Sequence, residues 1–386
     1  MNPMAANRFE GLNVSSKFAI CGLPIRLDTY KNCTFGCRYC FSNYRVVMER
    51  QQDIAIADVD SINRRLDRIF NRRKINDGNL LDTLVSKRLT WHCGGMSDPF
   101  QPINASLRIT NQIIDICNEY GIRILFSTKG ATIHDASCRP DLHSFQLSVT
   151  NVDDRKDLEP NVPSIAQRKR FFDELKKAGF KVGIRIQPFI PKVTDERIID
   201  LFSDADHFTI EGLKLVPQNH EQIEYVCALL GIPLSAFHND GLYNLDYSVR
   251  EELYRPIIER IRTKTKATYN VSDNDMRQEG QCRCCCGDSL VGEGGASGID
   301  TTAMIKDCGN GYGLPEVLQR VEALGLSQCK CAHLFASNRQ DFGKTVEDFF
   351  NSKFKSKSAP ASPKFQNTNA QMEMFEMREI MNWMDN

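Results

Sequence analysis

The sequence predicts an α/β protein: a partial (β/α)6 barrel followed by a C-terminal cysteine-rich accessory domain. Short apolar runs alternate with amphipathic stretches six times along the first two thirds of the chain. Such alternation is typical of parallel strands joined by crossover helices. The composition, 41% hydrophobic and 25% charged, suits a globular protein with a sizeable core. In barrels of this kind, chemistry gathers at the C-terminal ends of the strands.

The strand-like runs give the order of the barrel. In chain order they cover 18–28, 88–93, 122–128, 144–150, 181–189 and 207–216. The helix-like stretches between them cover 57–70, 105–120, 164–178, 194–203 and 218–229. Ser164 can cap the third of these helices, and Gly179 supplies its stop. A further helix is predicted over 240–266 and a further strand over 267–275.

Composition divides the remaining chain. We expect an N-terminal extension (1–17), the barrel (18–235), the cysteine-rich domain (236–352), a linker (353–370) and an amphipathic helix (371–386). The linker is rich in Lys, Ser, Pro and Asn. The last helix is rich in Met, so it either docks on its own domain or binds a partner protein.

Charge and hydropathy narrow the class of protein. Lys plus Arg and Asp plus Glu number 49 each, so no global positive field indicates a nucleic-acid partner. We find no secretory signal and no apolar segment long enough to span a bilayer, and we expect a cytoplasmic protein without a membrane partner. One basic stretch either contacts phosphates or forms a solvated helix face: Arg64, Arg65, Arg68, Arg72, Arg73 and Lys74.

Cysteine is the most informative residue type. The chain has 15, clustered and without an export signal, which favours metal or catalytic thiols over disulfides. Cys33, Cys37 and Cys40 follow the first predicted strand in a C-x3-C-x2-C spacing. Three thiolates on one loop can ligate three irons of a [4Fe–4S] cubane and leave the fourth iron open. Zinc sites usually pair C-x2-C units and need four ligands, so they fit this spacing poorly.

This spacing, with the aromatic residues Tyr39 and Phe41 beside the last cysteine, resembles the radical S-adenosylmethionine (radical SAM) superfamily. The resemblance implies that the open iron chelates the amino and carboxylate groups of S-adenosylmethionine. Reductive cleavage would then give methionine and a 5′-deoxyadenosyl radical that abstracts a substrate hydrogen. It also implies an oxygen-sensitive enzyme and a reductant such as flavodoxin or ferredoxin.

A second segment, CGGMSDPFQP (93–102), ends the second predicted strand, where radical SAM proteins place a segment that holds the methionine amino group. Gly94 and Gly95 suit this role because backbone without a side chain lets a ligand approach closely. Met96 stands where Glu is commoner, which leaves the contact to backbone carbonyls and to Ser97 or Asp98. The alternative is a plain turn.

Further segments in order, FSTKG (126–130), LSVTNVDD (147–154), LEPNVP (158–163) and IRIQPFIP (184–191), resemble the spore photoproduct lyase-like branch of that superfamily. The resemblance implies that Ser148 and Arg185 contact the methionine carboxylate or the ribose, with Lys129 nearby. Structural ion pairs of Arg185 and Lys129 are the alternative.

The resemblance also implies a nucleic-acid base or nucleoside as substrate, and it allows a cysteine as hydrogen donor. Cys93 is the candidate, although a lone strand cysteine is usually a buried small hydrophobe.

The C-terminal cysteines predict a second metal site, an auxiliary iron–sulfur cluster in preference to zinc. The chain offers more thiols here than packing needs, with His333 as a weak extra candidate. The expected pool of ligands for this second site is Cys284, Cys286, Cys308, Cys329 and Cys331.

Two other functions stay open: a peptide-modifying radical SAM enzyme, and a non-catalytic iron–sulfur or zinc protein that binds a partner. The intact 94–96 segment and Ser148 argue against the non-catalytic protein.

Overall fold

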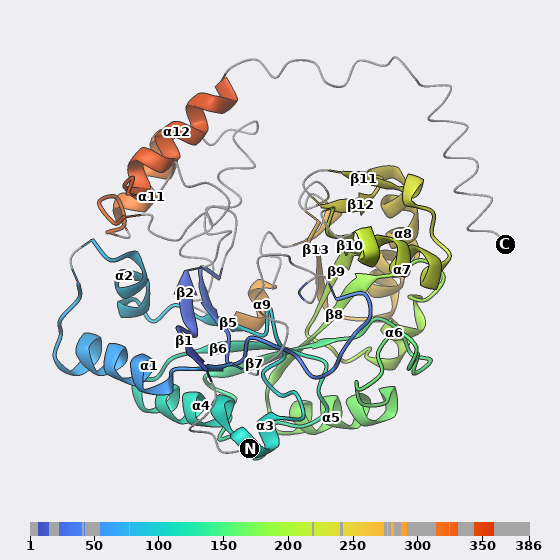
Figure 1. Cartoon of the computed structure of the whole chain (residues 1–386), viewed down its shortest axis with the longest axis horizontal. Coiled ribbons are helices and arrows are strands. Elements are labelled where there is room, and N and C mark those ends of the chain that lie inside the picture. The colour runs from blue at the N-terminus through green and yellow to red at the C-terminus, as the bar shows by residue number, and fades with distance from the viewer. Residues whose placement is uncertain are drawn as a thin grey trace.

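The structure is a computed structural model of the chain (Figure 1). It describes residues 7–14, 23–40, 42, 55–76, 78–217, 220–239, 242–273, 276, 279–281, 287–291, 314–323, 325–330 and 343–358.

The centre of the molecule is an eight-stranded sheet in the order β13-β9-β8-β7-β6-β5-β3-β2. All neighbours are parallel except β2 and β3, so the predicted partial barrel is confirmed. The strands in chain order are β2 (Leu12–Val14), β3 (Ile25–Leu27), β5 (Trp91–Cys93), β6 (Ile124–Thr128), β7 (His143–Ser148), β8 (Lys181–Phe189), β9 (His207–Gly212) and β13 (Thr268–Val271). A separate parallel pair joins β1 (Arg8–Phe9) to β4 (Ile56–Ala57).

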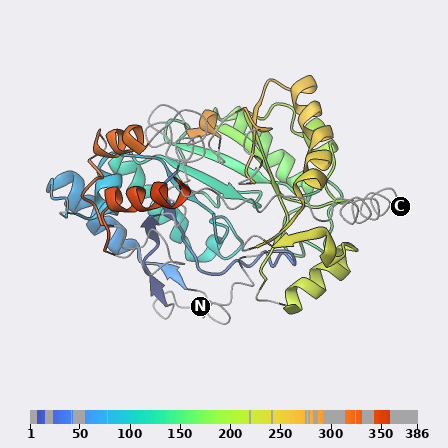
Figure 2. The same cartoon turned by 90° about the horizontal axis from the view of Figure 1, so that it is seen from above.

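Helices cover the outer side of the curved sheet (Figures 1 and 2). The third predicted helix has the expected signals: Ser164 forms a capping box with Gln167, and Gly179 adopts a φ of +87° after the last turn. A π-helical turn, Asp67–Asn71, continues the first helix. The crossover helices are α1 (Val59–Leu66), α2 (Leu80–Ser86), α3 (Asn104–Leu107), α4 (Ile109–Tyr120), α5 (Ile165–Lys177), α6 (Arg197–Leu201), α7 (His220–Leu230) and α8 (Tyr247–Lys264).

Three predicted elements differ in detail. The 105–120 helix is divided into α3 and α4 because Arg108 adopts a left-handed φ of +52°. The 207–216 strand leaves the barrel after Gly212, and its end becomes β10 (Lys214–Leu215). β10 joins β12 (Tyr243–Leu245) and β11 (Phe237–Asn239) in a small antiparallel sheet, which takes the start of the predicted 240–266 helix.

The sheet also continues past residue 235, since β13 pairs with β9 in parallel register. Beyond it, α9 (Asp288–Val291) packs on the inner side of the barrel against β6, β7 and β8. Gly183 makes room for it, because a Cβ there would lie 2.7 Å from Leu290 Cδ1. The helices α11 (Leu314–Ala323) and α12 (Val346–Ser358) lie beside α2 (Figures 1 and 2). Thus α12 enters the predicted linker, whereas the predicted 371–386 helix lies outside the described residues.

Two apolar cores hold the fold together. One lies between the sheet and the outer helices and contains Trp91, Phe126 and Phe145. The other joins the Cys33–Cys40 loop, through Phe35 and Tyr39, to segments that follow β8 and β9. Among the helices the structure describes, none is both long and apolar enough to cross a membrane.

Candidate active site

The loop with the three predicted ligands leaves the C-terminal end of β3 and enters the second apolar core. Cys37 is buried, Cys33 and Cys40 are partly buried, and none of the three forms a disulfide. Gly36 turns the loop with a φ of +65°, and Cys40 N–H donates to the Cys37 carbonyl at 3.2 Å. Burial raises the pKa of Cys37 to about 12. Three cysteines on an apolar-lined loop fit a cluster by donor type and shielding.

Gln101 fixes the backbone around Cys33, a role that sequence reasoning missed. It is fully buried; its Oε1 accepts from Thr34 N–H at 2.7 Å, and its Nε2 donates to the Asn32 carbonyl at 2.8 Å. Asn161 Nδ2 donates to the Thr34 carbonyl at 3.0 Å from the other side. The signal lay within the 93–102 segment, but a glutamine there carries no motif of its own.

Gly94 and Gly95 have different structural roles. A Cβ on Gly94 would lie 2.1 Å from the Ser127 carbonyl oxygen, and its φ is +102°. Glycine is therefore required here because residue 94 packs closely against β6, and not because a ligand approaches it. Gly95 is exposed, and a Cβ there would meet only His92 and Arg26 at 3.8–4.0 Å. It is thus the glycine whose missing side chain leaves room on the inner side.

The residues after Gly95 bind the cluster loop to the barrel. The Met96 carbonyl accepts from Ser42 Oγ at 2.8 Å, and Ser97 Oγ donates to the Tyr30 carbonyl. Asp98 accepts hydrogen bonds from Lys129 N–H at 2.6 Å and from Thr128 and Phe100. Burial nevertheless raises its pKa to about 6. Ser97 and Asp98 therefore shape the segment, and their predicted contact with the cofactor stays a prediction.

Glu159 connects the cluster loop to the end of β6. It lies 2.7 Å from Lys129 Nζ and 3.7 Å from Arg168 Nη2, and the Tyr39 hydroxyl donates to it. Burial alone would raise the pKa of this carboxyl, but the charges of Lys129 and Arg168 hold it at about 2. Lys129 Nζ also lies 5.6 Å above the Tyr39 ring. Lys129 therefore makes an ion pair, and its predicted place beside the cofactor stays a prediction.

The inner side of the barrel carries a row of hydrogen-bonded polar side chains, here called the polar belt. His92 Nε2 lies 2.9 Å from Ser127 Oγ, which donates to Gln146 at 3.3 Å. Gln146 donates to Thr209 at 3.2 Å, and Thr209 donates to Asn270 at 2.9 Å. Burial, followed by the charges of nearby arginines, lowers the pKa of His92 to about 3, so it stays neutral. The belt crosses β5 to β13, and its members other than His92 are buried.

Ser148 at the end of β7 is the register partner of Arg185, and both adjoin the belt. The sequence predicts both residues at strand ends, but Arg185 lies in the middle of β8. Arg185 Nη2 lies 2.8 Å from Glu211, which also pairs with Lys214. Lys214 Nζ lies 3.4 Å from buried Asp273. Arg185 thus also makes an ion pair, as the structural alternative predicts. Ser148 lies on the side of the strand that faces the belt, and its contact with the cofactor stays a prediction.

The structure does not bring Cys93 to this site. Alternation along β5 turns His92 inward, whereas Cys93 is fully buried in the apolar core between sheet and helices, near Cys117 of α4. Burial raises its pKa well above the usual range. The thiol therefore lies where a small apolar side chain would, and a different face of the sheet lines the site.

The predicted second metal site falls mostly outside the described residues, as do Cys284, Cys286, Cys308, Cys331 and Phe41. Cys329 is buried beside α2, with its sulfur 3.5 Å from Thr83 Oγ1. No three His, Cys, Asp or Glu side chains within the described ranges converge on a single ion. Thiols that each take a different iron of a cubane need not converge in that way.

The basic stretch is divided between paired and exposed residues. Arg65 and Arg68 each lie 2.7 Å from a carboxylate oxygen of Asp82, which is fully buried, so these two arginines stabilise a buried carboxylate. The other four residues of the stretch, Arg64, Arg72, Arg73 and Lys74, are exposed, as on a solvated helix face. Contact of these residues with phosphates stays a prediction.

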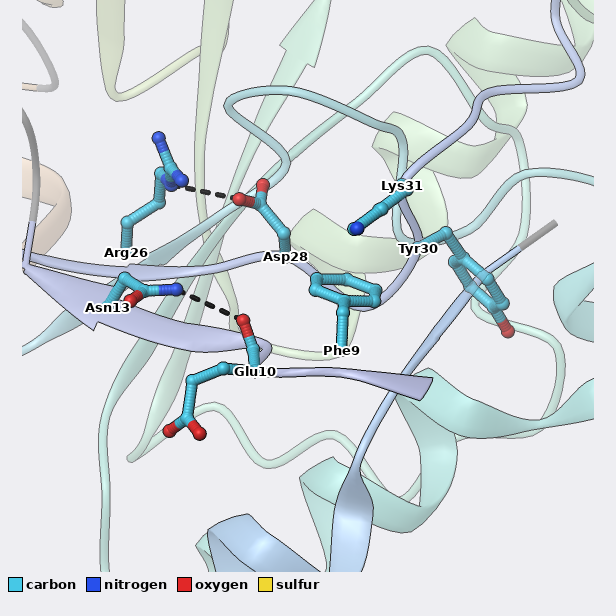
Figure 3. Close-up of a pocket in the computed structure, with 7 residues that line it drawn as sticks. All are labelled: Phe9, Glu10, Asn13, Arg26, Asp28, Tyr30 and Lys31. Atoms are coloured by element: carbon cyan, nitrogen blue, oxygen red, sulfur yellow. Dashed lines mark hydrogen bonds and ion pairs between the residues drawn. The ribbon is translucent and has the colours of Figure 1, made fainter. Parts of the chain in front are cut away.

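A pocket of about 320 Å³ opens beside β1, β2 and β3 (Figure 3). Arg26 pairs with Asp28 at 2.8 Å across it, and Lys31 Nζ lies 5.3 Å above the Phe9 ring. Through Arg26, next to Gly95, this pocket adjoins the inner side of the barrel near the cluster loop.

Comparisons with known proteins concern the fold. No family model and no curated protein sequence matches the chain. A cysteine-to-serine mutant of spore photoproduct lyase aligns with a TM-score of 0.50 at 17% identity, covering 69% of this chain and 80% of the lyase. A tyrosine-to-phenylalanine mutant of that lyase gives 0.50 at 16%, over 69% and 80%. SuiB of Streptococcus suis, bound to its precursor peptide, gives 0.35 at 14%, over 70% and 61%.

The alignment with the lyase spans most of both chains, and at 17% identity it concerns the fold. This chain has the partial-barrel fold of the radical SAM proteins.

Proposed function

We propose that this protein is a cytoplasmic, oxygen-sensitive radical SAM enzyme with a [4Fe–4S] cluster on Cys33, Cys37 and Cys40. One observation carries the proposal: three cysteines at this spacing, none of them in a disulfide, lie at the C-terminal end of a barrel strand, in the fold that spore photoproduct lyase has. The bound cluster would supply the electron that cleaves S-adenosylmethionine to methionine and a 5′-deoxyadenosyl radical.

The chain's own residues would bind and orient the cofactor. Gly95 leaves room on the inner side, and Ser148 lies on the strand face that turns toward the polar belt. Arg185 is held in position by Glu211, so its guanidinium is oriented before any ligand arrives. Apolar side chains around Cys37 exclude water from the loop. A radical is protected from side reactions in such a shielded site.

For the substrate we propose a nucleic-acid base or nucleoside, acted on by a lyase-type reaction. The support is the likeness to spore photoproduct lyase, together with the uncharged polar side chains on the inner side of the barrel. We also keep the proposal of an auxiliary cluster on the C-terminal cysteines, on the density of thiols there.

The first test is an anaerobic reconstitution with iron and sulfide counted per chain. Wild type is compared with a variant in which Cys33, Cys37 and Cys40 are all replaced by Ala. Two cubanes predict about eight irons that fall to about four in the variant. One cubane predicts about four that fall to none. With dithionite and S-adenosylmethionine, wild type should release 5′-deoxyadenosine and the variant none; a wild type without iron would refute the proposal.

A further inference from the structure

A buried ion pair lies between the cluster loop and the barrel. The Glu159 side chain is 5% exposed and that of Lys129 is 14% exposed, and their charged atoms are 2.7 Å apart. Charges taken out of water are stable only when paired and hydrogen-bonded. Lys129 meets this need with a second bond, to Thr150 Oγ1 at 3.2 Å. The pair is therefore a built feature of the fold and not a surface contact.

This pair touches the loop at the residue between two of the predicted ligands. The Tyr39 hydroxyl donates to Glu159, and Lys129 Nζ lies 5.6 Å above the same ring. Tyr39 follows Cys37 by two positions and precedes Cys40.

Arg168 holds the carboxylate from behind. Its Nη2 lies 3.7 Å from Glu159, and its Nη1 donates to the Ser148 carbonyl at 2.8 Å. Arg168 is 1% exposed, and it keeps Glu159 attached to the end of β7 when Lys129 is substituted. A change at Lys129 can therefore be read as a change of charge rather than as release of the loop.

We propose that Glu159 is a positioning residue that holds Tyr39. By neutralising the charge of Lys129, Glu159 also keeps the reduction potential of the cluster low. This inference rests on the proposed function. In a medium of low dielectric, an uncompensated positive charge favours the added electron, and a negative charge opposes it. Neighbouring groups of this kind tune metal sites without ligating them.

The experiment compares four variants with wild type: Glu159→Gln, Lys129→Met, the double variant, and Asp173→Asn. The last is the matched control, a carboxylate in an exposed pair with Lys169. The cluster of each reconstituted protein is titrated anaerobically and followed by electron paramagnetic resonance, with iron counted per chain. At a fixed potential, Glu159→Gln should raise the ratio of reduced to oxidised cluster about tenfold, which is about 59 mV for one electron.

Lys129→Met should lower that ratio by a similar factor, the double variant should return close to wild type, and Asp173→Asn should not move it. Shifts of one sign in both single variants, or none, would overturn the inference, because loosening of the loop has no reason to change sign. If Glu159→Gln loses its iron, Lys129→Met decides: a lowered ratio supports the inference and any other result overturns it. A wild type that takes up no cluster overturns the proposed function with it, whereas a loaded wild type with unmoved variants overturns the inference alone.

Discussion

Substitution by alanine should lower the stability of the protein strongly at Gly94 and hardly at all at the adjacent Gly95. In Gly94→Ala the new Cβ would lie 2.1 Å from the Ser127 carbonyl oxygen and 3.1 Å from Pro99 Cδ, at a φ of +102°. In Gly95→Ala the nearest atom is His92 Cε1 at 3.8 Å, an ordinary contact. The pair is matched, because both substitutions add one methyl group to one turn.

The magnitude follows from two costs. A side chain held in a sparsely populated backbone region costs about 1–3 kcal/mol. Forcing β5 away from β6 adds about 1–3 kcal/mol, as in other overpacked cores. Gly94→Ala should therefore lower the free energy of unfolding by about 2–6 kcal/mol, a large part of the total that a domain has. Gly95→Ala should change it by less than about 0.5 kcal/mol.

The assay is urea unfolding followed by circular dichroism, with the midpoint and slope compared under anaerobic conditions. The affinity for S-adenosylmethionine is measured on the same samples. We expect Gly95→Ala to keep its midpoint and to bind the cofactor more weakly, because its methyl group enters the inner side beside Arg26. Equal midpoints for the two variants would refute the packing argument, and unchanged affinity in Gly95→Ala would refute the assignment of the free space.

Three further predictions test other parts of the structure. Gln101→Leu removes both bonds to the cluster loop and leaves its backbone groups unpaired, so iron retained per chain should fall after desalting, with a loss of about 1–3 kcal/mol. Asp82→Asn breaks two buried ion pairs and should cost about 3–5 kcal/mol, whereas Asp60→Asn, at an exposed pair, should cost less than about 1 kcal/mol; urea midpoints compare the two. Burial lowers the pKa of His207 from 6.5 to about 4, so the stability from its neutral form is present above pH 6.5 and is lost as pH falls toward 4. His207→Gln should remove up to about 3 kcal/mol of this dependence, and equal pH profiles of the urea midpoint would contradict it.

Local signals in the chain predicted the fold well. The six strand-like runs correspond to six of the eight strands of the central sheet, because an apolar run buried on one side reads the same in any context. The Ser164 cap and the Gly179 stop are also local, since each acts within one helical turn. The predicted bounds of an element were wrong where pairing with a distant segment sets them. For example, β10 leaves the barrel to pair with β12, nearly thirty residues later.

The site shows the same division. The spacing of Cys33, Cys37 and Cys40 marked the loop, because ligands on one tight turn are set by the chain alone. Lys129 was named, but its partner Glu159 was not, because the two are thirty residues apart and neither lies in a repeating pattern. Gln101 was missed for the same reason.

The sequence by itself determined the class of fold, six of its strands in chain order and the cysteine loop. Tertiary structure alone decided which side of each strand faces the site: it turned His92 inward and Cys93 outward, although both lie on one short strand. It also decided that Gly94 serves packing and Gly95 leaves space. The physical reason is that side-chain direction depends on register with β6, and register is set by contacts across the whole barrel rather than by neighbours in the chain.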